Sequence, residues 1–149
     1  MAICAENDNS LGLKIMVCGS IGYNRAGASD ITKLYSFLQN KGFSIVNHIK
    51  QRESMDYSDI IDFRDKKELS HKIVSHDLQY IEKADIIVVI ANGASYGTSI
   101  EMFVANNFGK QIILLAKESV PSPWPINFSD YIVKSENELI QLLYQLQGE

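Results

Sequence analysis

The fold of this chain is decided by one stretch, Ile86–Glu101, which reads IIVVIANGASYGTSIE. Its first six residues, 86–91, are all apolar, which is typical of a central parallel strand covered on both faces. Asn92-Gly93 breaks the strand, and small residues lead into a helical pattern with Val104 and Ala105 on one side. A strand, a tight turn and a helix in this order predict an α/β sheet, whose ligand site is expected at the carboxyl ends of the strands.

Strands and helices alternate through the rest of the chain, which predicts a parallel sheet with helices on both faces. The helix expected over 30–40 begins at Asp30 as its N-cap and carries Tyr35 in its apolar stripe. We expect strands over 13–18, 43–47, 85–91, 111–116 and 131–134, and helices over 30–40, 68–83, 98–108 and 136–147. We also expect a long loop over 48–67, of the kind that often forms a lid, and a shaped loop over 120–128.

The composition is that of an ordinary globular protein, since 46% of the 149 residues are hydrophobic and 21% are charged. We expect a disordered N-terminus over 1–12 and a single domain over 13–149. The formal net charge of −4, with no stripe of Lys or Arg, argues against nucleic-acid binding. Cys4 and Cys18 fit no disulfide framework. With neither a signal peptide nor a membrane-spanning stretch in view, the chain is expected to be cytoplasmic.

Two carboxylates stand where the helical patterns predict an inward-facing side chain. The apolar stripe of the helix over 68–83 runs through position 77, which is Asp77, and Glu101 lies one turn before Val104 and Ala105. A buried carboxylate is costly unless it is paired, so both are candidate catalytic groups. The alternatives are an Asp77 that caps a loop or faces solvent because the helix phase is shifted, and an acid favoured by the helix dipole at Glu101.

Two turns rich in small residues follow strands at the same edge of the sheet. The first, Gly19-Ser20-Ile21-Gly22, could bring backbone amides to a phosphate, and Arg25 could add charge. The second contains Ser95 and Gly97. Each is equally compatible with an ordinary βα turn, and a surface role for Arg25 is equally compatible.

His48 follows the second expected strand, again at the carboxyl edge. It is either a site residue or a loop histidine. His71 and His76 are five residues apart, which does not place them on one face of a helix. Since no group of His, Cys and carboxylate residues has the spacing of metal ligands, we expect neither a metal nor a cofactor.

Read in order, the chain carries a series of motifs: Cys18-Gly19-Ser20-Ile21, His48, His76-Asp77-Leu78, Ala84-Asp85, Ser95-x-Gly97-x-x-x-Glu101 and Gly109-Lys110. The series resembles that of the 2′-deoxynucleoside 5′-phosphate N-hydrolases, which are close relatives of the nucleoside 2-deoxyribosyltransferases. The resemblance covers residues 13–118 and includes the interval of 24 residues between Asp77 and Glu101 (101 − 77 = 24).

The resemblance implies a flavodoxin-like, five-stranded parallel sheet and a homodimer whose partner chain completes each active site. It also implies cleavage of the N-glycosidic bond between base and sugar without a metal. Glu101 matches the family nucleophile that attacks the anomeric carbon, and Asp77 matches the carboxylate that assists at the base or sugar. His48 matches a histidine near the substrate.

The resemblance also implies a phosphate site. Ser20 and Ser95 match serines that bind the 5′-phosphate, with the turn 19–25 around them, and Ser122 is the candidate for the serine lent by the partner chain. The transferases have an acid in place of Ser95, which would repel a phosphate dianion, so serine favours a nucleotide over a nucleoside. Family hydrolases often have an aromatic residue in place of Met16, so ribose and deoxyribose both stay open.

The leading interpretation is therefore an enzyme that hydrolyses the N-glycosidic bond of nucleoside 5′-monophosphates. The runner-up is a deoxyribosyltransferase, which would be recognised by capture of the sugar by a second base. A different class is a nucleotide-binding module without chemistry. A flavodoxin-like signalling domain ranks lowest, because an inward-facing Glu101 would then lack a purpose.

Overall fold

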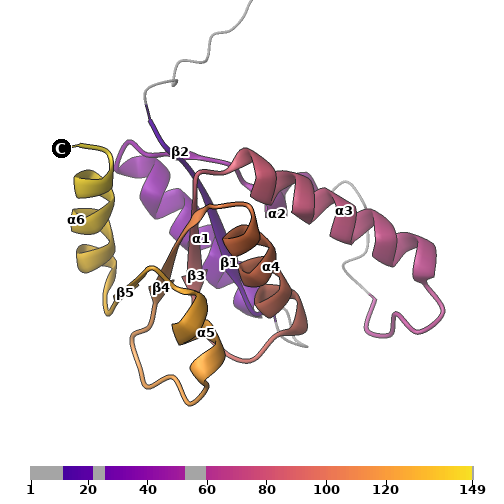
Figure 1. Ribbon diagram of the computed structural model, residues 1–149. Helices are drawn as coiled ribbons and strands as arrows, with labels where there is room; N and C mark the ends of the chain where they lie inside the picture. The colour runs from indigo at the N-terminus through magenta and orange to yellow at the C-terminus, as the bar shows by residue number, and fades with distance from the viewer. Residues whose placement is uncertain (1–11, 22–25, 53–59, 149) are drawn as a thin grey trace, which may run out of the picture.

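The computed structural model describes residues 12–21, 26–52 and 60–148. Its strands form one all-parallel sheet in the order β2-β1-β3-β4-β5 (Figure 1). This confirms the flavodoxin-like α/β class expected from the sequence. The strands are β1 (Lys14–Gly19), β2 (Ser44–Ile45), β3 (Ile86–Ile90), β4 (Gln111–Leu115) and β5 (Tyr131–Val133).

Helices cover both faces of the sheet. They are α1 (Ala26–Asn40), α2 (His48–Arg52), α3 (Lys67–Lys83), α4 (Tyr96–Asn107), α5 (Pro123–Phe128) and α6 (Glu136–Leu146). Alternate residues of each strand point to opposite faces, so the core divides into two clusters. One joins the sheet to α1 and α6, and the other joins it to α3, α4 and α5. In β3, residues 86–89 are all buried, as expected of a central strand.

Helix α1 begins at Ala26, four residues before the expected N-cap, so the prediction of Asp30 as the cap is wrong. The reason lies at Gly27, whose N–H donates to the carbonyl of Ile21 over 3.0 Å. A Cβ at Gly27 would stand 1.6 Å from the carbonyl oxygen of Ser20. Only glycine allows the helix to start this close to the turn after β1.

Two segments expected as loops contain short helices. The segment 48–67 begins with α2, and residues 53–59 lie outside the described part of the chain. The segment 120–128 contains α5, with Ser122 as its N-cap and Pro123 at the first helical position. Proline fits there because its missing N–H would have had no partner in the helix. Helices of five or six residues are too short to show a hydrophobic period in the sequence.

None of the helices in the described ranges combines the length and the apolar run that crossing a bilayer requires. The N-terminal residues 1–11, where disorder was expected, lie outside the described part of the chain.

Candidate active site

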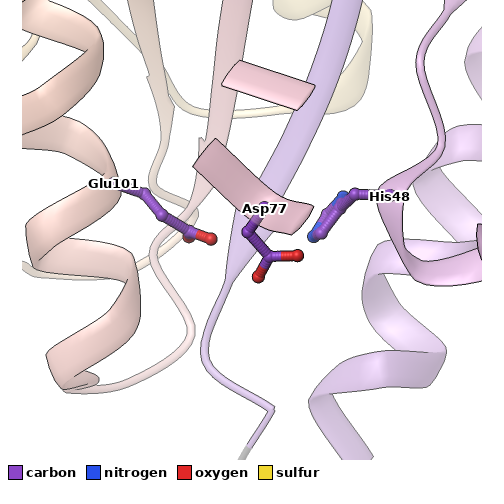
Figure 2. A group of neighbouring side chains, drawn as sticks. All are labelled: His48, Asp77 and Glu101. Atoms are coloured by element: carbon purple, nitrogen blue, oxygen red, sulfur yellow. The ribbon is translucent and has the colours of Figure 1, made fainter. Parts of the chain in front are cut away.

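Three side chains from three helices converge on one face of the sheet: His48 of α2, Asp77 of α3 and Glu101 of α4 (Figure 2). One ring nitrogen and one oxygen from each carboxylate all lie within 4.8 Å of one another. His48 is 2% exposed and Asp77 is 7% exposed, while Glu101 is partly buried. The structure thus brings together the two predicted catalytic acids and the predicted histidine.

Asp77 is buried, as the apolar stripe of α3 predicted. Its neighbour His76 places Nδ1 3.1 Å from Asp77 Oδ1, and the His76 ring stacks on Tyr80 with centroids 4.6 Å apart. Within the described residues, Nε2 of His76 is buried without a hydrogen-bond partner. A proton on that nitrogen would be an unpaired buried donor. A tautomer that carries its proton on Nδ1 and donates it to Asp77 avoids that cost.

His48 is held from the other side by Tyr35 of α1, whose hydroxyl lies 2.9 Å from His48 Nδ1. The sequence placed Tyr35 in an apolar stripe, and its ring is indeed in the core, at 1% exposure. Burial, with smaller contributions from Cys18 and Glu101, raises the pKa of the Tyr35 hydroxyl well above its usual value, although amide hydrogen bonds oppose this. Tyr35 therefore stays protonated through the neutral range.

The two predicted turns meet at the carboxyl ends of β1 and β3. The side chain of Asn92 brackets the backbone of Ser20, because its Oδ1 accepts from Ser20 N over 2.9 Å and its Nδ2 donates to Ser20 O over 3.0 Å. The hydroxyl of Ser20 donates to the carbonyl of Ala94 over 3.4 Å. Gly93, with a φ of 137°, allows this approach. The sequence pattern identified Asn92 only as a residue that ends the strand before it.

Ser95 caps α4, since its Oγ accepts from Thr98 N over 3.2 Å. Gly97 lies in the first turn of this helix, and a Cβ there would meet nothing closer than Ser95 Oγ at 3.9 Å. Gly19 and Ile21 flank Ser20 in the described turn. The other two predicted residues of that turn, Gly22 and Arg25, lie outside the described residues. Since Ser95 and Gly97 leave the start of α4 uncrowded, the first turn of this helix offers amide groups for an anion.

A cavity of about 570 Å³ opens between the edge of the sheet, α4 and α5. Ser95 and Ser122 both line it, together with Met102 and Trp124. Ser122 accepts from Trp124 N over 3.3 Å and so has a structural role within its own chain. Its expected role toward a partner chain stays a prediction. A cavity of about 700 Å³ on the α1 and α6 face is lined by none of the predicted site residues.

Histidine and carboxylate side chains are also residue types that bind divalent cations. The expectation of no metal rested on spacing along the sequence. Spacing carries no information here, because the three residues come from α2, α3 and α4. Loss of activity on chelation would therefore distinguish a metal-dependent site from a metal-free one.

The sequence matches the family model described as nucleoside 2-deoxyribosyltransferase over residues 15–143. Similar folds include a 2-deoxyribosyltransferase from Bacillus psychrosaccharolyticus (TM-score 0.65, 20% identity, 85% of this chain and 89% of that chain). They also include the CMP N-glycosidase BcmB from Clostridium botulinum (TM-score 0.51, 23% identity, 89% of this chain and 98% of that chain). A third is a 2-deoxyribosyltransferase from Leishmania mexicana (TM-score 0.55, 12% identity, 89% of this chain and 97% of that chain). No curated protein compared with the chain matches it in sequence.

If Asp77 serves the site rather than the fold, removing its buried charge is expected to cost little stability. We predict that Asp77→Leu changes the free energy of unfolding by less than about 0.5 kcal/mol, as measured by urea unfolding at neutral pH, because relief of the repulsion from Glu101 offsets the loss of the bond to His76. Asp85→Leu is the matched control, because Asp85 is exposed and accepts from Lys14 N over 2.8 Å. It should lose about 0.5–1.5 kcal/mol. An equal or larger loss in Asp77→Leu would make Asp77 a structural residue.

Proposed function

Because the chain belongs to the nucleoside 2-deoxyribosyltransferase family, whose enzymes cleave N-glycosidic bonds, we propose that it hydrolyses nucleoside 5′-monophosphates to a free base and (deoxy)ribose 5-phosphate. The observation that carries the proposal is the convergence of Glu101, Asp77 and His48 within 4.8 Å. The shared fold does not choose between hydrolase and transferase, since both kinds of enzyme are among the similar structures.

The spacing of the two carboxylates favours a covalent route. Asp77 and Glu101 oxygens within 4.8 Å are closer than the roughly 6.5–9.5 Å that inverting glycosidases keep for a water, and nearer to the roughly 5–5.5 Å of retaining ones. In this mechanism the C–N electron pair leaves with the base as Glu101 bonds to the anomeric carbon, and Asp77 stabilises the positive charge on the sugar. Water then hydrolyses the glycosyl ester: its OH bonds to the anomeric carbon, and Glu101 leaves as a carboxylate. The remaining proton of the water ends on the base, which left with the C–N electron pair.

The turns at Ser20 and Ser95 support a phosphate on the substrate. Asn92 and the Ser20–Ala94 hydrogen bond join the two turns, so that a phosphate between them would be held by parts of one unit. Glu101 lies on the same helix that Ser95 begins. Binding the phosphate would therefore fix the sugar relative to the nucleophile, which is a gain in positioning.

The preference for ribose or deoxyribose is a finer question. Met16 is fully buried in β1, within the core cluster on the α3 and α4 face. Its thioether is at best a weak acceptor and donates no hydrogen bond. Both ribo- and deoxyribonucleotides are therefore candidate substrates.

We also propose that the active enzyme is a homodimer formed through α4 and α5. Tyr96, Ile100 and Phe103 follow one another along α4 and are 94%, 58% and 51% exposed, and Trp124 of the adjoining α5 is 69% exposed. Large side chains gathered in this way mark an interaction surface more often than an idle one. Since Trp124 and Ser122 also line the 570 Å³ cavity, a second copy seated here would reach the cavity that Ser95 lines, although His48, Asp77 and Glu101 are not among its lining residues.

The first test is release of free base, followed by chromatography, from ribo- and deoxyribonucleoside 5′-monophosphates and the matching nucleosides. We expect release from monophosphates only, unchanged by a chelator, and abolished in Glu101→Gln while the fold is kept. Asp77→Asn should lower the rate by about 10²–10⁴-fold. Transfer of the sugar to an added second base would favour a transferase, loss of activity on chelation would require a metal, and tight binding without turnover would identify a binding module.

The side chain at position 95 is expected to select for the phosphate. We predict that Ser95→Asp lowers kcat/KM for monophosphates by at least about tenfold, because a carboxylate repels the dianion. Activity on the matching nucleosides should not fall in parallel. Asn106→Asp, in the last turn of α4 with an exposed side chain, is the control for added charge. Equal losses with both substrates would place the phosphate elsewhere.

The dimer is tested by sedimentation equilibrium. Phe103→Glu should convert the protein to monomers and reduce base release, because a charge would then be buried in the interface. Val74→Glu, which also replaces an exposed apolar residue, on α3 and at 54% exposure, should leave the dimer intact. A wild-type monomer that is fully active would refute the shared site.

A further inference from the structure

The hydroxyl of Tyr35 is buried among polar groups that belong to three different parts of the chain. It lies 2.9 Å from Val17 N, 2.9 Å from Val46 O and 2.9 Å from His48 Nδ1, with Val17 O farther away at 3.4 Å. The phenol side chain comes from α1 and crosses to the end of β2, where α2 begins. The proposed hydrolysis does not use this hydroxyl directly.

The number of protons available restricts how these bonds are made. The amide of Val17 can only donate, so it takes up one lone pair of the Tyr35 oxygen, and the carbonyl of Val46 can only accept. Tyr35 has one proton, and the raised pKa of its hydroxyl keeps that proton in place. If the proton goes to Val46 O, then His48 Nδ1 must donate, and all three neighbours are satisfied. If it goes to His48 Nδ1, the Val46 carbonyl loses this bond.

We propose that Tyr35 is a positioning residue that holds a proton on Nδ1 of His48 and so makes Nε2 the only nitrogen of that ring that exchanges protons. Figure 2 shows the His48 ring directed toward Asp77. Because Nδ1 lies against Tyr35, the far nitrogen Nε2 is the one presented to the carboxylates. The use of this nitrogen in base release rests on the proposed function, whereas the tautomer itself does not.

Nε2 exchanges its proton in a defined electrostatic setting. Asp77 from α3 and Glu101 from α4 face the ring, and His76 Nδ1 lies 3.1 Å from Asp77 Oδ1. Cys18 of β1 and Glu101 also act electrostatically on Tyr35. When both carboxylates are ionised, a proton on Nε2 offsets their repulsion, while the Nδ1 proton is retained by Tyr35 in either state. Proton exchange at Nε2 would then require no turning of the ring.

The direct test is nitrogen-15 NMR of His48 in the wild-type protein, assigned with His48→Gln. We expect Nδ1 to carry a proton at every pH at which the protein is folded, and the resonance of Nε2 alone to respond to pH. A neutral His48 with its proton on Nε2 would overturn the proposal. This measurement needs no substrate, so it stands or fails separately from the proposed function.

The kinetic test uses Tyr35→Phe. This variant should lower kcat by about 10- to 100-fold, which is the effect of losing a partner that orients a metal-bound histidine. KM should change by no more than about twofold. In a His48→Gln background, Tyr35→Phe should cause no further loss in kcat, because the hydroxyl acts through His48. Additive losses would indicate mere structural damage and refute the proposal. Tyr144→Phe is the control and should keep full activity, since the bond that its hydroxyl makes within the described residues is to the Lys41 carbonyl. If Tyr35→Phe does not fold, the NMR result decides.

Discussion

The burial of β3 on both faces is the constraint on which the rest of this structure depends. A parallel strand with no polar residue requires helices above and below it, and right-handed crossovers then place α3 and α4 on the same face. These two helices pack against each other, so inward-facing residues on them must meet. Asp77 and Glu101 are such residues. The meeting of these two carboxylates is therefore a consequence of how the sheet is covered.

Much of the fold followed from patterns that repeat over ten or more residues. The parallel sheet, the central strand and the inward direction of Asp77 were all legible in the spacing of apolar side chains. The start of α1 was not, because it depends on the contact of Gly27 with a distant turn. Nor were α2 and α5, which are shorter than any reliable helical period.

The candidate site, like the fold, was predictable from the sequence only in part. Each of His48, Asp77 and Glu101 could be singled out from its own neighbourhood, but their meeting within 4.8 Å depends on three separate helices. Asn92 and Tyr35 were missed as site residues because their side chains bond to Ser20 and His48, which are far from them in sequence or hidden by an apolar pattern. A residue whose role lies in a long-range hydrogen bond leaves no periodic signal. The turn residues Gly22 and Arg25 lie outside the described chain.

The cap of α4 has an energetic consequence of its own. Ser95 Oγ already accepts from the amide of Thr98, and its proton remains for an acceptor outside the helix. An anion that takes this proton polarises the hydroxyl and strengthens the capping bond, because hydrogen bonds in series reinforce one another. Occupancy of the turn and integrity of the helix are then thermodynamically linked. The empty protein would have a more easily frayed first turn in α4, and ligand would raise its resistance to hydrogen exchange.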